Sequence, residues 1–212
     1  MRRGLLFPDL EPGDVSQGWL VDLPSVTSGQ VLDVLSRRHS MEGWNGRPGR
    51  WVFLREVCAT TGAWGDQQRF DALALGLVPS VRYARVVYEV KVSRGDWLRE
   101  QKPRIDEKFV FVDEAGEGAM APDGHWETVK TLRPGNKWDA ALAVSTEFWY
   151  AAPPRCILPS ELPPEAGLLE VRGWGPNHEL RARVVRQAPV RETPTPDAGF
   201  WAAALREAAK RP

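Results

Sequence analysis

Two acidic residues and a lysine in this chain have the types and spacing needed for metal-dependent chemistry. Glu89 and Lys91 lie two residues apart in a segment that is otherwise apolar, 86–92, and such a run is typical of a buried strand. Because side chains alternate along a strand, Glu89 and Lys91 share one face. Burying charges is costly unless they are paired or bind a metal, so this face requires a compensating group.

Asp71 is the predicted complement, in a second segment (69–75) that also has the composition of a strand. The chain between these segments can turn back, and a hairpin of this kind would place Asp71 beside Glu89. Two adjacent carboxylates repel, and a hard divalent cation with oxygen ligands resolves that repulsion. Lys91 would then hold a metal-activated water or stabilise charge developing on a phosphate. A buried ion-pair network without a metal is the alternative.

The spacing of these residues resembles a known signature. Asp71 followed by Glu89-Val90-Lys91 is similar to the D…(D/E)xK pattern of the PD-(D/E)XK nuclease superfamily. The surrounding order of segments resembles the MmcB-like DNA repair branch of that superfamily and related phage-type proteins, over roughly residues 50–172. The segments that carry this order are 51–57, 88–98, Lys137-Trp138, 146–154 and 161–171.

This resemblance implies an α/β domain of restriction-endonuclease-like type, with a central mixed sheet flanked by helices. It implies a deoxyribonuclease that hydrolyses phosphodiester bonds with Mg²⁺ or Mn²⁺, in DNA repair or in a phage context. Asp71, Glu89 and the Val90 carbonyl would hold the metal. Glu56, on a helix expected over about 50–60, would complete the metal shell or bridge a second ion; a solvated helix glutamate is the alternative. The rival function is a catalytically inactive DNA-binding or protein-interaction module of the same fold.

DNA is the expected partner, although Lys+Arg (28) and Asp+Glu (28) balance to zero net charge. The charges are unevenly distributed: residues 171–191 contain five arginines and one glutamate, and local basic patches can contact phosphates. The candidates for phosphate contacts are Ser93, Arg94, Arg99 and Lys102. Lys137, in the first turn of a helix expected from about 136 to 145, would face a phosphate or Glu89, or be solvated. Trp97 and Trp149 are the candidates for stacking on bases. The chain has no separate recognition domain, which favours DNA structure or ends as the target.

The elements that must position these residues fall into three parts. Residues 1–24 are predicted to be an extended arm, 25–191 the nuclease-like domain, and 192–212 a linker with a C-terminal helix. Within the domain, 103–136 interrupts the family pattern and is predicted to be an inserted β-hairpin, with Asp123-Gly124 as a turn signal. A first helix is expected to end near His39, and further strands are expected over 148–152, 168–171 and 180–185.

Composition limits the remaining possibilities. No apolar run is long enough to span a membrane, and the N-terminus does not have the pattern of a signal peptide, so a cytoplasmic protein is expected. The two cysteines are far apart in the sequence and are expected to be thiols. The three histidines are scattered and form no zinc-binding motif. The oligomeric state stays open, with a homodimer among the options.

Overall fold

The computed structural model describes residues 26–39, 49–59, 69–101, 104–112, 125–133, 138–174, 179–193 and 195–210, and only the backbone of 104–112, 125–133 and 138. The predicted arm, 1–24, therefore lies outside the described residues. The chain divides into two compact units, one made of Met1–Arg94 with Lys137–Pro212 and the other of Gly95–Asn136.

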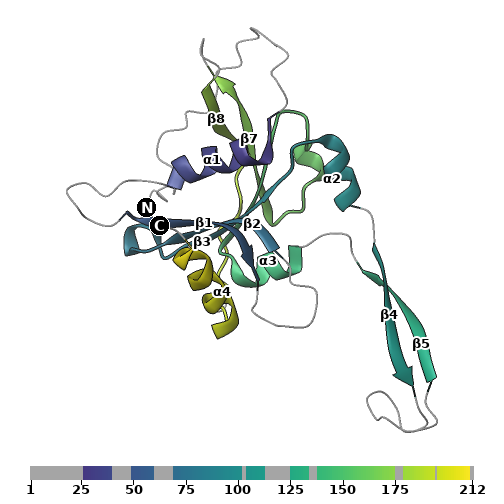
Figure 1. Ribbon diagram of the computed structural model, residues 1–212. Coiled ribbons are helices and arrows are strands. Elements are labelled where there is room, and N and C mark those ends of the chain that lie inside the picture. Colours follow the sequence, from purple (N-terminus) through teal and green to yellow (C-terminus); the bar gives the residue numbers. More distant parts are fainter. Residues whose placement is uncertain are drawn as a thin grey trace. The chain divides into compact units, whose positions relative to one another are not determined.

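A six-stranded mixed sheet forms the centre of the first unit (Figure 1). Its strands lie in the order β1 (Trp51–Cys58), β2 (Arg69–Gly76), β3 (Arg85–Val90), β6 (Glu147–Ala152), β7 (Ala166–Trp174) and β8 (Glu179–Arg186). The pairs β3–β6 and β6–β7 are parallel, and the other three pairs are antiparallel. The chain is thus a mixed α/β protein, as the sequence predicted.

Helix α1 (Ser28–His39) covers one face of this sheet (Figure 1). Its buried stripe of Val31, Val34 and Leu35 joins a core cluster with every second residue of the central strands, among them Tyr88 and Trp149. The N-terminus of α1 is capped by Thr27, whose Oγ1 accepts a hydrogen bond from the Gln30 amide (3.3 Å). The alternation of β3 therefore assigns its even-numbered residues to α1 and its odd-numbered residues to the opposite face.

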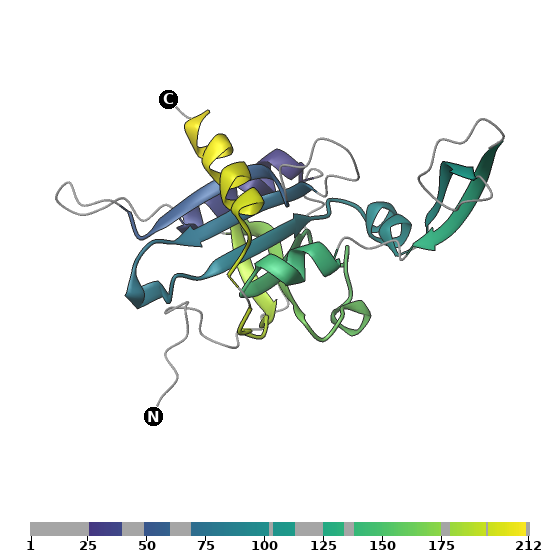
Figure 2. The same cartoon turned by 90° about the horizontal axis from the view of Figure 1, so that it is seen from below.

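Helices α3 (Trp138–Val144) and α4 (Ala198–Ala209) lie on that opposite face (Figures 1 and 2). The chain reaches α4 through an extended segment held by arginines: Arg191 donates to the Ser145 carbonyl (3.0 Å), and Arg85 donates to the Thr193 hydroxyl (2.5 Å). Asp197 then caps α4 by accepting from the Phe200 amide (2.8 Å). The predicted C-terminal helix is confirmed, and Phe200 buries its ring completely.

The second unit contains most of α2 (Arg94–Glu100) and the pair β4 (Arg104–Val112) and β5 (His125–Arg133). These strands pair antiparallel from Arg104–Arg133 to Val112–His125. The antiparallel strand pair predicted within 103–136 is thus confirmed, while its being an insertion into a family pattern stays a prediction. Its expected turn at 123–124 lies outside the described residues.

The helix predicted over about 50–60 is wrong, because Trp51–Cys58 forms strand β1 and pairs with β2 along its length. Trp51, Val52, Phe53 and Val57 are β-branched or aromatic residues, which favour strands. A short apolar run fits helical and strand spacing equally well, and pairing with β2 decides the outcome. Glu56 interrupts the strand geometry with a left-handed φ of 53°.

A buried polar cluster lies under the C-terminal turn of α1. His39 Nε2 is 2.7 Å from the Tyr88 hydroxyl, and Trp149 Nε1 donates to Glu147 Oε2 (3.0 Å). Burial, assisted by the charge of Arg38, lowers the pKa of His39 to about 3. Burial also raises the pKa values of Tyr88 and Glu147 above their usual ranges. These groups are therefore stabilised in their neutral forms by the core that surrounds them.

We expect Gly167→Ala to lower the free energy of unfolding by about 1–3 kcal/mol. An added Cβ would lie 2.5 Å from the Trp149 ring and 2.6 Å from the Ala188 amide nitrogen, in a sheet where neither can retreat. Urea denaturation measures the effect. Gly29→Ala is the matched control: its Cβ meets only Thr27 Oγ1 at 3.9 Å, and alanine favours a helix by up to ~1 kcal/mol. Equal stability of the two variants would contradict the close approach at Gly167.

We expect His39 to stay neutral between pH 8 and pH 5, because its folded pKa is about 3. The unfolded chain binds this proton near pH 6.5. The free energy of unfolding therefore falls as pH drops from about 6.5 towards 3, by up to ~1.4 kcal/mol per pH unit. The raised pKa of Glu147 has the opposite effect on the pH dependence of the free energy of unfolding. The His39 contribution is therefore isolated by comparing wild type with His39→Gln. Imidazole NMR signals of His39 that titrate near pH 6.5 would contradict this expectation.

Candidate active site

Asp71 lies at the end of the β2–β3 ladder, where its carboxylate replaces a main-chain acceptor. The last paired residues are Ala72 and Tyr88, so continuing the register by one residue sets Asp71 opposite Glu89. Asp71 Oδ2 accepts a hydrogen bond from the Val90 amide (2.7 Å). Residues opposite each other in an antiparallel pair point to the same face. The structure thus brings Asp71 to the strand position beside Glu89 that the sequence predicted.

Glu89 and Lys91 form an ion pair on that face, opposite to α1. Lys91 Nζ lies 2.7 Å from Glu89 Oε1, and the two side chains are only 11% and 6% exposed. An i,i+2 pair along a strand can meet in this way because both side chains project from the same face. The lysine therefore supplies a compensating charge for a carboxylate buried in an apolar strand.

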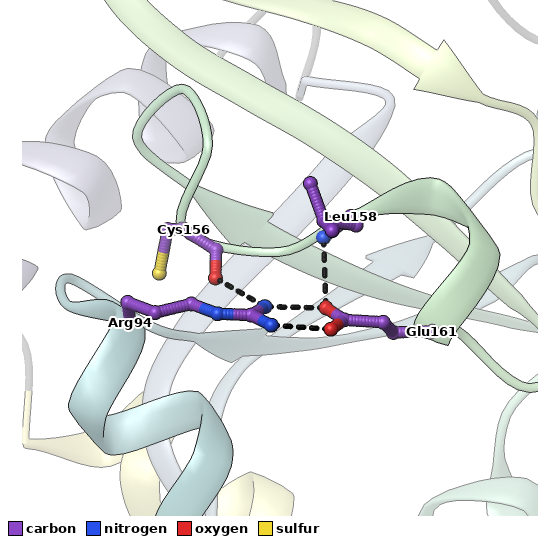
Figure 3. A network of polar contacts seen from close by, with 4 residues as sticks. All are labelled: Arg94, Cys156, Leu158 and Glu161. Carbon is purple, nitrogen blue, oxygen red and sulfur yellow. Dashed lines mark hydrogen bonds and ion pairs between the residues drawn. The ribbon is translucent and has the colours of Figure 1, made fainter.

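The segment after β3 is fastened to the crossover that links β6 to β7, 153–165 (Figure 3). Lys91 donates its amide to the Ala151 carbonyl (3.0 Å), and its own carbonyl accepts from Cys156 Sγ (3.6 Å). Arg94 makes a bidentate ion pair with Glu161 and also donates to the Cys156 carbonyl (3.3 Å). Glu161 raises the pKa of Arg94 through these hydrogen bonds. The backbone that carries Lys91 is thus held from both sides.

Glu56 stays outside the group formed by Asp71, Glu89 and Lys91. Its side chain is 68% exposed and pairs with Arg69 at 3.2 Å. The β1–β2 register would set position 56 opposite Asp71, but the left-handed backbone at Glu56 departs from strand geometry. A role for Glu56 at a metal stays a prediction that the observed side-chain position does not favour.

The predicted phosphate-binding residues that the structure describes differ in their surroundings. Arg94 forms an ion pair with Glu161. Arg99 belongs to the second unit, where it pairs with Asp96 (2.5 Å). Ser93 is exposed directly after β3. Lys102 and Lys137 lie outside the described residues. The predicted stacking residues Trp97 and Trp149 are both 0% exposed, so neither ring can stack on a base in this conformation.

The chemistry of the donors fits Mg²⁺ or Mn²⁺. Two carboxylates and the Val90 carbonyl supply hard oxygen ligands, and Mg²⁺ is commonly bound by one or two carboxylates with water and substrate phosphates completing its shell. Among the described residues, no group of three or more His, Cys, Asp and Glu side chains is arranged to hold a metal.

Sequence reasoning missed the residues that support this site from a distance. Glu161 is 67 residues from Arg94, and nothing in the local pattern around Glu161 indicates a partner. Cys156, which the sequence predicted only to be a thiol, is buried and contacts the backbone of Lys91. Contacts of this kind depend on the crossover's path over the sheet, which composition and periodicity do not specify.

Comparison with known proteins gives a fold neighbour without an assigned function. No family model matches the chain, and no curated protein matches it. A solved structure, the SPO1766 protein of unknown function from Silicibacter pomeroyi, is 19% identical and aligns over 88% of each chain with a TM-score of 0.48. That level of likeness carries no argument about activity. None of the described helices is long and apolar enough to cross a membrane.

We expect Lys91→Met to lower the free energy of unfolding by about 3–5 kcal/mol in metal-free buffer, because Glu89 would lose its cationic partner while it stays buried. The double variant Glu89→Gln/Lys91→Met should be more stable than Lys91→Met alone. Urea denaturation in EDTA measures both. Arg181→Met is a matched control, since Arg181 pairs with Glu179 at the same spacing but both side chains are more than half exposed, and its loss should cost at most ~1 kcal/mol. Equal effects of Lys91→Met and Arg181→Met would contradict the buried pair.

Proposed function

We propose that the protein is a metal-dependent deoxyribonuclease that hydrolyses phosphodiester bonds, with a restriction-endonuclease-like fold. The observation that carries the proposal is the meeting of Asp71, Glu89 and Lys91 on one face of adjacent strands, with Lys91 2.7 Å from Glu89. The resemblance of these residues to the D…(D/E)xK signature supports the same assignment. DNA repair or a phage context remains the expected setting.

In this proposal Asp71 Oδ2 accepts from the Val90 amide and Glu89 Oε1 pairs with Lys91. The carboxylates of Asp71 and Glu89 and the Val90 carbonyl would hold the ion. Bound Mg²⁺ or Mn²⁺ supplies Lewis acidity and lowers the pKa of a coordinated water. Lys91 orients the attacking water and stabilises the charge that develops on the phosphate.

A non-catalytic module of the same fold is the second candidate. The Glu89–Lys91 pair is complete by itself, and a buried ion pair of this kind needs no metal. The exposed position of Glu56 also leaves the site with two carboxylates instead of three. This candidate predicts binding of DNA or protein without metal-dependent cleavage.

We expect Asp71→Asn to reduce Mn²⁺ binding and to lower hydrolysis of DNA and of bis(p-nitrophenyl) phosphate at least about a hundredfold, since loss of a metal ligand removes several kcal/mol of transition-state stabilisation. Asparagine can still accept from the Val90 amide, so the fold should be retained. Calorimetry measures Mn²⁺ affinity, and product release measures hydrolysis on single-stranded, duplex and branched DNA.

Asp33→Asn is the control, because Asp33 is an exposed carboxylate of α1 that pairs with Arg55 (2.7 Å); it should bind Mn²⁺ and cleave as wild type does. Glu56→Gln decides separately whether Glu56 contributes. Wild-type protein that binds DNA but neither binds Mn²⁺ nor hydrolyses either substrate would overturn the nuclease proposal and leave the non-catalytic module.

A further inference from the structure

The outer part of the β7–β8 hairpin presents an uncovered surface on the same sheet face as Glu89 and Lys91. Strand alternation and the register of β7 and β8 place Arg172, Trp174, Glu179, Arg181 and Arg183 there. We call Arg172, Trp174, Arg181 and Arg183 the arginine–tryptophan strip; Glu179 lies beside it, opposite Trp174. Arg181, Arg183 and Trp174 are exposed, and Arg172 is half-buried.

The strip continues the row of residues that contains Lys91. Extending the β3–β6 register by one residue pairs Lys91 with Ala152; Ala152 pairs with Glu170, and Glu170 pairs with Arg183. Strands lie ~4.8 Å apart, so Arg183 lies three strands and about 14 Å from Lys91 along the sheet. Trp174 and Arg172 follow further along β7, in the direction in which β3 runs towards Lys91.

The arrangement of charges within the strip lowers the stability of the β7–β8 hairpin. Arg172 and Arg181 are direct cross-strand partners, and like charges in that position are destabilising. Each arginine interacts with a neighbouring side chain instead. The Arg172 guanidinium lies 5.1 Å from the Trp174 ring centroid, and Arg181 forms an ion pair with Glu179 (2.8 Å). The Arg181 side chain is 61% exposed, and an exposed pair contributes little. A bound polyanion would relieve the remaining repulsion.

Trp174 provides an aromatic surface that the buried tryptophans of the sheet do not. It is 51% exposed, whereas Trp149 is 0% exposed. Large aromatic side chains that stay exposed beside arginines are suited to stacking on nucleic-acid bases, and such stacking does not depend on sequence. The stacked base must be unpaired, because a base inside a duplex has both faces covered.

We propose that the arginine–tryptophan strip binds single-stranded DNA, with a base on Trp174 and phosphates on Arg181 and Arg183. This inference rests on the proposed function, since it gives the candidate active site a strand of defined form on its own face of the sheet. An acidic peptide is the competing partner; it would satisfy the arginines but leave the indole without a stacking partner.

The test is binding of a fluorescein-labelled oligothymidylate, followed by anisotropy in EDTA so that no cleavage occurs. Trp174→Ala should weaken binding about fivefold or more. Arg181→Gln/Arg183→Gln should lower the slope of log K against log [salt] by about 1.4, at about 0.7 for each phosphate contact on a single strand. Binding of the corresponding duplex should be weaker and insensitive to Trp174→Ala.

Matched controls come from the far edge of the same sheet. Trp201→Ala removes an exposed tryptophan of α4 (37% exposed), and Arg55→Gln/Arg206→Gln removes two arginines remote from the strip; both should bind as wild type. Equal affinities of Trp174→Ala and Trp201→Ala would overturn the proposal. So would displacement by polyglutamate as effective as displacement by unlabelled oligothymidylate, which would indicate an acidic protein partner.

The two proposals fail separately. Hydrolysis of bis(p-nitrophenyl) phosphate by wild-type protein tests the chemistry without a nucleic-acid strand. Strip-dependent binding without hydrolysis would support the strip and reject the nuclease, whereas hydrolysis with strip-independent binding would reject the strip alone.

Discussion

The burial of Glu89 in a central strand is the constraint on which the arrangement of this protein depends. β3 pairs with β2 on one side and β6 on the other, so its residues have no edge through which to reach water. Glu89, a residue only 4% exposed there, needs a compensating partner. Lys91, directly after the strand, meets that requirement, and it leaves the even-numbered residues of β3 to build the apolar core under α1.

The two faces of β3 therefore differ in how their polar groups are stabilised. On the α1 face, polar groups such as His39 and Tyr88 are kept neutral and paired with each other. On the opposite face, charges are kept and compensated by partners from neighbouring segments, as in Asp71 with the Val90 amide and Arg94 with Glu161. The charged face is the one that can respond to an ion or a phosphate, because it carries the carboxyl, amine and guanidinium groups.

The sequence predicted those parts of the fold whose signals are local. Apolar composition predicted β2 and β3, a hairpin between them predicted the position of Asp71 beside Glu89, and the turn signal Asp123-Gly124 indicated the β4–β5 pair. The segment 51–58 was assigned wrongly because eight residues span barely two helical turns, too few to separate two periods, and its state is decided by pairing with β2. The Arg94–Glu161 pair was not predictable, since its partners meet only after the 153–165 crossover has taken its path.

The zero net charge of the chain conceals an uneven distribution of charge in the structure. A chain of zero net charge can still collect arginines on one face. Alternation in β7 and β8 places Arg172, Arg181 and Arg183 on one face of the sheet, where Glu170 and Glu179 partly balance them, and the residues between them pack towards α1. Placing Arg172 opposite Arg181 reduces the stability of the hairpin, and the sheet tolerates it because the buried side of the same strands, through Leu169 and Val171, holds them in register. The apolar face thus supplies stability that offsets the charge repulsion on the other face.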